Sequence, residues 1–147
     1  MMRGTAAIVV TDASVLVNFL RVDRMELIGR CSREFILTDH VREEISEHYA
    51  EQQERLQRAL AAGHVSEGAI VDAQELRLFG QLSASGQLGA GECSAIAVAI
   101  CRRHSLAIDD KLAIRRAHAI DAELPIFGTH DIMRLMIQEQ LITIADA

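Results

Sequence analysis

Residues 8–14 read Ile-Val-Val-Thr-Asp-Ala-Ser, and this stretch sets the pattern for the rest of the chain. The β-branched run before Asp12 is typical of a strand that is buried on both faces of a sheet. After Asp12, residues 14–20 change to the apolar spacing of a helix, so the aspartate stands between a strand and a helix. Parallel α/β sheets bind ligands at this end of their strands, whereas an aspartate before a helix also acts as its N-cap. The other acids of the chain distinguish these two interpretations.

The composition favours one layered domain. The chain has 147 residues, of which 50% are hydrophobic and only 3% aromatic, and its formal net charge is −6. This length and this aliphatic content predict a single domain, residues 1–147, built from helices packed on a sheet. The negative charge argues against nucleic-acid binding through bulk charge, but it allows a nucleic-acid substrate where metal ions neutralise the acids.

Two features predict a cytoplasmic protein. The three cysteines, Cys31, Cys93 and Cys101, form no CxxC pair, so we expect neither a disulfide framework nor a zinc site. No apolar run approaches the length of a membrane span, and Asp12 interrupts the N-terminal apolar stretch, so we expect no signal peptide and no membrane anchor.

Strand-like apolar segments alternate with helical segments along the chain. We expect strands at residues 8–11, 35–38, 106–108 and 125–127, and either a brief strand or a loop at 64–70. We expect helices at 15–20, 25–29, 39–62, 72–82, 92–104, 111–120 and 131–140, with Asp39 and Thr129 as N-caps of the third and the last. This alternation predicts an α/β fold, a three-layer α/β/α sandwich with a short, mainly parallel central sheet.

Four carboxylates are expected at one edge of that sheet: Asp12, Glu44, Glu92 and Asp110. Each also has a purely structural interpretation, as an N-cap or as an acid in the first turns of a helix. Four acids at one edge would repel one another strongly unless a cation joined them. Carboxylate oxygens are hard ligands, so the cation they favour is Mg²⁺ or Mn²⁺.

The four acids occur in order within short motifs: Asp12 in Ile-Val-Val-Thr-Asp-Ala-Ser, Glu44 in Val-Arg-Glu-Glu-Ile, Glu92 after Gly-Ala-Gly, and Asp110 in Leu-Ala-Ile-Asp-Asp. Together these motifs resemble the acidic constellation of PIN domains, a family that includes the VapC-like toxins of bacterial and archaeal toxin–antitoxin pairs. The Asp109-Asp110 pair and the Phe-Gly-Thr turn at residues 127–129 resemble the DUF3368 branch of that family. The resemblance covers nearly the whole chain.

The resemblance implies a metal-dependent endoribonuclease, the toxin of a type II toxin–antitoxin pair, that hydrolyses RNA with metal-activated water. It implies that Asp12, Glu92 and Asp110 are catalytic acids that bind one or two Mg²⁺ or Mn²⁺ ions. Glu44 would bind the metal directly or through water. A homodimer and a small antitoxin partner follow from the same resemblance.

Two further residues have supporting interpretations. By the resemblance, Ser14 corresponds to the small hydroxyl residue that orients the first acid or a water, although a hydroxyl near a helix N-terminus also has a capping role. Asp109 either supports the metal ligands or caps a helix.

Positive charge gathers around the third predicted strand, at Arg102, Arg103, Lys111, Arg115 and Arg116. These residues either contact the phosphates of a substrate, Lys111, Arg115 and Arg116 above all, or form a solvated helix face. The few aromatic side chains leave little capacity for base stacking.

Two other classes of protein remain open. A receiver-like or phosphatase-like domain also places acids at strand ends, but Glu44 and Glu92 begin helices, which fits that plan poorly. A catalytically weak PIN fold would serve as a regulatory binding module or as an RNA-processing factor.

Overall fold

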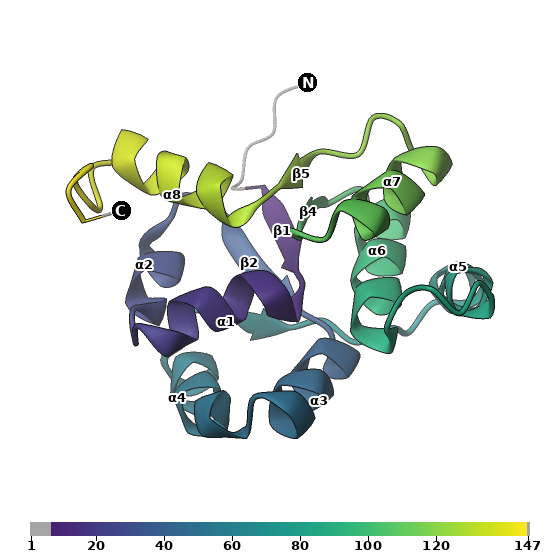
Figure 1. Cartoon of the computed structure of the whole chain (residues 1–147), viewed down its shortest axis with the longest axis horizontal. Helices are drawn as coiled ribbons and strands as arrows, with labels where there is room; N and C mark the ends of the chain where they lie inside the picture. Colours follow the sequence, from purple (N-terminus) through teal and green to yellow (C-terminus); the bar gives the residue numbers. More distant parts are fainter. Residues whose placement is uncertain (1–6, 147) are drawn as a thin grey trace.

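The computed structural model describes residues 7–146, and a parallel sheet lies at the centre of this part of the chain (Figure 1). Its strands are β1 (Ile8–Thr11), β2 (Glu34–Leu37), β3 (Ser66–Glu67), β4 (Ser105–Ala107) and β5 (Ile126–Phe127). They lie in the order β3-β2-β1-β4-β5, and all four pairings are parallel. The segment at residues 64–70, left open between strand and loop, therefore contributes a short edge strand.

Within residues 7–146 the helices are α1 (Ala13–Arg21), α2 (Met25–Arg30), α3 (Asp39–His48), the 3₁₀ helix η1 (Ala50–Gln52), α4 (Gln53–Ala62), α5 (Ala73–Ala84), α6 (Ala90–Arg102), α7 (Lys111–Ile120) and α8 (Thr129–Gln138). Figure 1 shows α6 and α7 on one side of the sheet and α1, α2 and α8 on the other. The predicted three-layer α/β/α sandwich with a parallel sheet is confirmed. None of these helices is long and apolar enough to cross a membrane.

Strand β1 lies in the middle of the sheet because it pairs with β2 on one side and with β4 on the other. Val9 and Val10 are at most 1% exposed, as the β-branched run predicts for a central parallel strand. The backbone N–H of Asp12 still donates to Ala107 O at 2.8 Å, and helix α1 begins at the next residue. Asp12 is thus held at the carboxyl edge of the two central strands.

The prediction of one helix over residues 39–62 is wrong, because the chain turns at Tyr49. Its backbone angles, φ −135° and ψ 52°, are not helical, and η1 follows before α4 begins. An uninterrupted helix of this length would extend about 36 Å. The turn instead returns α4 to the core, where Leu56 is 1% exposed. The helix then ends as predicted at Gly63, which has a positive φ of 79°.

Two predicted N-caps are also wrong by one residue. Thr38, not Asp39, caps α3, since Thr38 Oγ1 accepts a hydrogen bond from Val41 N at 3.1 Å. Gly128, not Thr129, caps α8, and its N–H donates to Asp131 Oδ2 at 2.8 Å in a capping box. As a result, the Thr129 side chain is available for another contact.

Candidate active site

Asp12 is the most deeply buried of the four candidate acids, with 2% of its surface exposed. Its Oδ2 accepts hydrogen bonds from Ser14 N at 3.3 Å and from Ser14 Oγ at 2.8 Å. Its Oδ1 is buried and has no hydrogen-bond partner among residues 7–146. Burial raises the pKa of Asp12, the bonds from Ser14 oppose that rise, and the charge of Asp110 adds to it. Asp12 is both the N-cap of α1 and an acid with one unused oxygen.

Glu92 lies in the first turn of α6, where its Oε1 accepts from Gly89 N at 3.1 Å and completes a capping box. Burial, above all, and the nearby carboxylates of Asp110 and Asp12 together raise its pKa to about 7, against the lowering effect of the hydrogen bond from Gly89 N. Asp110 itself caps α7 by accepting from Leu112 N at 3.2 Å. Glu92 and Asp110 therefore lie close enough to interact although they belong to different helices.

Glu44 approaches the same edge from α3 and is partly buried. Burial raises its pKa and the charge of Asp12 adds to the effect, while His48 opposes it. Its carboxylate lies against Gly91, since a methyl group built on that glycine would be 2.6 Å from Glu44 Oε1. All four candidate acids thus interact around Asp12 at one edge of the sheet.

None of the four acids forms an ion pair with a Lys, Arg or His side chain among residues 7–146, where the ion pairs involve other carboxylates. In the arrangement described here, no three Asp, Glu, His or Cys side chains of that part of the chain form a ready metal cage. The group is nevertheless made of carboxylate oxygens only, which are ligands for a hard divalent cation. Metal binding at this edge would require these side chains to converge on Asp12 Oδ1.

Asp109 points to a different partner from the four acids. Its two carboxylate oxygens accept hydrogen bonds from Thr129 N at 2.8 Å and from Thr129 Oγ1 at 2.6 Å. Thr129 Oγ1 in turn accepts from Asn18 Nδ2 at 3.0 Å. Asp109 thereby connects the end of β4 to the start of α8 and to α1.

Sequence reasoning missed Asn18 altogether and assigned Thr129 only a capping role. No local motif identifies this pair, because the two residues are separated by most of the chain and meet only in the folded structure. The Asp109-Asp110 doublet was the available signal, since one acid of the pair faces the candidate site and the other fastens the adjoining loop.

The predicted basic rim divides into two groups. Lys111 and Arg115 are exposed on α7, the helix that Asp110 caps, and Arg116 donates a hydrogen bond to Gln87. Arg102 instead binds the buried Glu75 through Nε at 2.6 Å, at the C-terminal end of α6. Ten residues of helix separate that end from Glu92, about 15 Å. Arg102 and Arg103 therefore do not border the acids.

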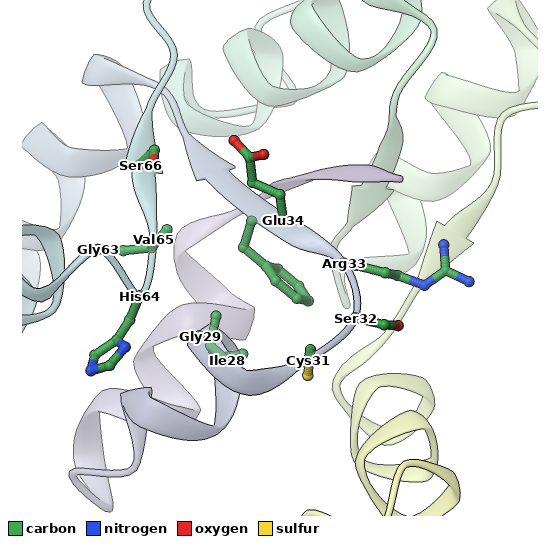
Figure 2. Close-up of a pocket in the computed structure, with 11 residues that line it drawn as sticks. Ile28, Gly29, Cys31, Ser32, Arg33, Glu34, Gly63, His64, Val65 and Ser66 are labelled. Carbon is green, nitrogen blue, oxygen red and sulfur yellow. The ribbon is translucent and has the colours of Figure 1, made fainter. Parts of the chain in front are cut away.

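A cavity of about 210 Å³ lies at the opposite edge of the sheet, between the segments that lead into β2 and β3 (Figure 2). Its polar side chains do not converge. Figure 2 shows Arg33 directed away from Glu34 and His64, and its guanidinium lies 5.0 Å from the centre of the Phe127 ring. None of the four acids lines this cavity, so the candidate active site is the acidic edge.

Three solved structures share a similar fold with this chain. A PilT N-terminus domain protein, SSO1118, from Sulfolobus solfataricus P2 matches with a TM-score of 0.58 and 19% identity over 89% of this chain and 94% of that one. PAE2754 from Pyrobaculum aerophilum matches with a TM-score of 0.59 and 17% identity over 91% and 93%. The RRP44 PIN domain of T. brucei matches with a TM-score of 0.56 and 11% identity over 93% and 83%.

These identities are low, so the likeness to the three structures concerns the fold. Among proteins with curated functions, none matches the chain. The sequence profile of the family DUF3368, described as a PIN domain, matches residues 8–147. PIN domains are in general nucleases. The match extends over almost the entire sequence, and the chain belongs to the PIN domain family, in its DUF3368 branch.

Proposed function

We propose that this protein is an endoribonuclease that requires Mg²⁺ or Mn²⁺, with Asp12, Glu92 and Asp110 as its metal-binding acids and Glu44 as a fourth, direct or water-mediated ligand. The observation that carries the proposal is Asp12 Oδ1, which is buried without a hydrogen-bond partner among residues 7–146. A buried polar atom without a partner is costly, so it needs a specific explanation. A cation bound there supplies one.

The chemistry of the surrounding groups supports this explanation. Glu92 has a pKa of about 7 that burial and neighbouring acids raise, which means that the metal-free edge tolerates negative charge poorly. Bound Mg²⁺ or Mn²⁺ would neutralise this charge, activate water and stabilise the transition state of phosphodiester hydrolysis.

The chain's own residues have separate tasks in this proposal. Ser14 holds Asp12 Oδ2 through two hydrogen bonds, so Oδ1 remains available to a ligand. Glu92 releases its proton when a cation reaches the edge. Lys111 and Arg115, exposed on the helix that Asp110 caps, contact the phosphates of the RNA strand and orient it.

The test compares two aspartates that play the same local part. Asp12 and Asp72 are both N-caps that accept from the backbone N–H two residues ahead, at 3.3 Å from Ser14 and 2.8 Å from Gln74. Asparagine caps a helix as well as aspartate does. We expect Asp12→Asn to fold, to lose Mn²⁺ binding in calorimetric titration and to lose RNA cleavage, whereas Asp72→Asn keeps both.

The alternative outcome is equally informative. If neither the wild-type protein nor Asp12→Asn binds Mn²⁺, and Asp12→Asn alters stability only, then Asp12 is a structural cap. The protein is in that case a PIN fold that acts as a binding module, and RNA binding without cleavage becomes the property to measure.

We further propose that the nuclease is the toxin of a type II toxin–antitoxin pair, that it forms a homodimer and that a small antitoxin inhibits it. This proposal is supported by the family, which includes VapC-like toxins. We expect induced wild-type protein to arrest the growth of a bacterial host, and Asp12→Asn at equal abundance not to do so. Normal growth of cells that contain active ribonuclease would instead identify an RNA-processing factor.

A further inference from the structure

The N-termini of α3 and α6 are joined by a buried chain of hydrogen bonds. Val41 N donates to Thr38 Oγ1 at 3.1 Å, Thr38 Oγ1 lies 2.6 Å from Ser94 Oγ, and Ser94 Oγ lies 2.8 Å from Gly91 O. Thr38 and Ser94 are both fully buried. These hydrogen bonds therefore connect the helix that carries Glu44 to the helix that carries Glu92.

Only one direction of donation satisfies every group. The carbonyl of Gly91 can only accept, so the single proton of Ser94 Oγ points to it. Thr38 must then donate its own proton to Ser94 Oγ, while it accepts from Val41 N. Each hydroxyl has a single proton and donates it in a hydrogen bond. The loss of either hydroxyl therefore leaves a buried polar group without its partner.

Gly91, the last residue in this series of hydrogen bonds, also lies against the Glu44 carboxylate. A methyl group built on Gly91 would lie 2.6 Å from Glu44 Oε1 and 3.5 Å from its Cδ, but 3.6 Å from the nearest atom of Val41. The first distance is impossible for a real side chain, whereas the last is ordinary contact. Alanine at residue 91 would thus displace the flexible carboxylate of Glu44 and little else.

We propose that Thr38, Ser94 and Gly91 are positioning residues that hold the Glu44 carboxylate in register with Glu92, so that two separate helices present their acids to the same cation. The hydroxyl chain fixes one helix N-terminus against the other. Gly91 leaves the space in which the Glu44 carboxylate lies, one residue before Glu92. This inference rests on the proposed metal-dependent function.

The central experiment compares two helical glycines. Gly91 in α6 would meet Glu44, whereas a methyl group on Gly80 in α5 meets no atom within 4 Å. Alanine favours both helices over glycine, so neither variant is expected to lose stability. We expect Gly91→Ala to weaken Mn²⁺ binding about 10- to 100-fold and Gly80→Ala to bind as the wild type does.

The same substitution in the Glu44→Ala background shows whether Gly91 acts through Glu44. There, Gly91→Ala is expected to cause no further loss of Mn²⁺ affinity, because the carboxylate that it displaces is already gone. Unchanged Mn²⁺ affinity in Gly91→Ala, or an equal loss in both backgrounds, would overturn the inference.

Thr38 provides the test of the hydroxyl chain. Thr38→Ser keeps the hydroxyl and Thr38→Val removes it at nearly the same volume. We expect Thr38→Ser to retain wild-type Mn²⁺ affinity and Thr38→Val to lose it in part. Equal affinities of the two variants would remove the hydroxyl chain from the proposal.

A metal-free readout separates this inference from the proposed function. In urea unfolding with chelator present, Gly91→Ala is expected to raise the midpoint more in the Glu44→Ala background than in the wild type, because only the wild type must move a carboxylate. An equal rise of the urea midpoint in both backgrounds would show that residue 91 does not contact the Glu44 carboxylate. If unequal gains occur in a wild type that binds no Mn²⁺, the proposed function fails while the positioning of Glu44 by Gly91 stands.

Discussion

Glu92→Gln is expected to reduce RNA cleavage by about 10²–10³-fold, the range typical of removing one group that stabilises charge in a transition state. Glu92 interacts with the charges of both Asp12 and Asp110, so it belongs to the centre of the acidic edge. Glu44 interacts with Asp12 alone among these acids. We therefore expect Glu44→Gln to have a smaller effect, about 10- to 100-fold. Initial rates on a labelled RNA at several Mn²⁺ concentrations measure both.

The neighbouring residue Glu43 provides the control for these rates, since it lies on the same helix and is exposed. Glu43→Gln changes the net charge of the protein by the same amount and should leave cleavage unchanged. If Glu43→Gln and Glu44→Gln lose activity equally, the effect arises from overall charge. If Glu92→Gln cleaves like the wild type, Glu92 is only the capping acid of α6.

The second large effect is the dependence of the stability of the metal-free protein on pH. Glu92 has a pKa of about 7 in the folded chain, raised by burial above the ordinary value of 4.5. Between these two values the folded chain holds a proton that the unfolded chain has released, so stability decreases as pH rises from about 4.5 to about 7. The raised pKa values of Asp12 and Glu44 act in the same direction.

Glu92→Gln removes the main source of this pH dependence because glutamine stays neutral. After allowance for the solvent that reaches this partly buried carboxyl, we expect the variant to be about 1–2 kcal/mol more stable than the wild type at pH 8. At pH 4.5 the two proteins should be nearly equal. Urea unfolding in the presence of a chelator at both pH values measures the difference. A constant difference at both pH values would mean that packing, and not ionisation of Glu92, separates the two proteins.

Loss of RNA cleavage together with a gain in stability would be the expected signature of a functional acid. Proteins retain groups that oppose folding where activity needs them. A capping acid behaves in the opposite way, because its removal lowers stability. Glu92 performs both tasks, since it accepts from Gly89 N at 3.1 Å in the capping box. Glutamine preserves this acceptor, so the substitution separates the charge from the cap.

The local sequence pattern was sufficient to predict those helices and strands whose structure depends mainly on their own residues. The helix at Lys111–Ile120 agrees with its prediction at both ends, because Asp110 marks its start and the apolar spacing marks its length. The β-branched run before Asp12 likewise predicted a central strand. In both cases the signal lies within about ten residues.

The local pattern was insufficient to predict features that depend on contacts between segments distant in the sequence. Residues 39–62 are helical in their spacing, but the chain breaks at Tyr49 so that α4 packs on the core. Threonine is a common N-cap residue, but the hydroxyl of Thr129 donates a hydrogen bond to Asp109 instead. The contact between Glu44 and Gly91 depends on how closely two helices approach. Packing distances of this kind are not encoded in spacing, so the relative placement of the acids required the structure.

The position of β1 in the sheet also determines when the acidic edge can form during synthesis. Val9 pairs with Phe35 on one side and with Ser105 on the other. The first pairing becomes possible while the chain is still short, but the second must wait until most of the chain has left the ribosome. Asp12 and Asp110 meet only with that second pairing. A nascent chain therefore exposes one edge of its central strand, a site for unwanted pairing, and stays without an assembled acidic edge until synthesis is nearly complete.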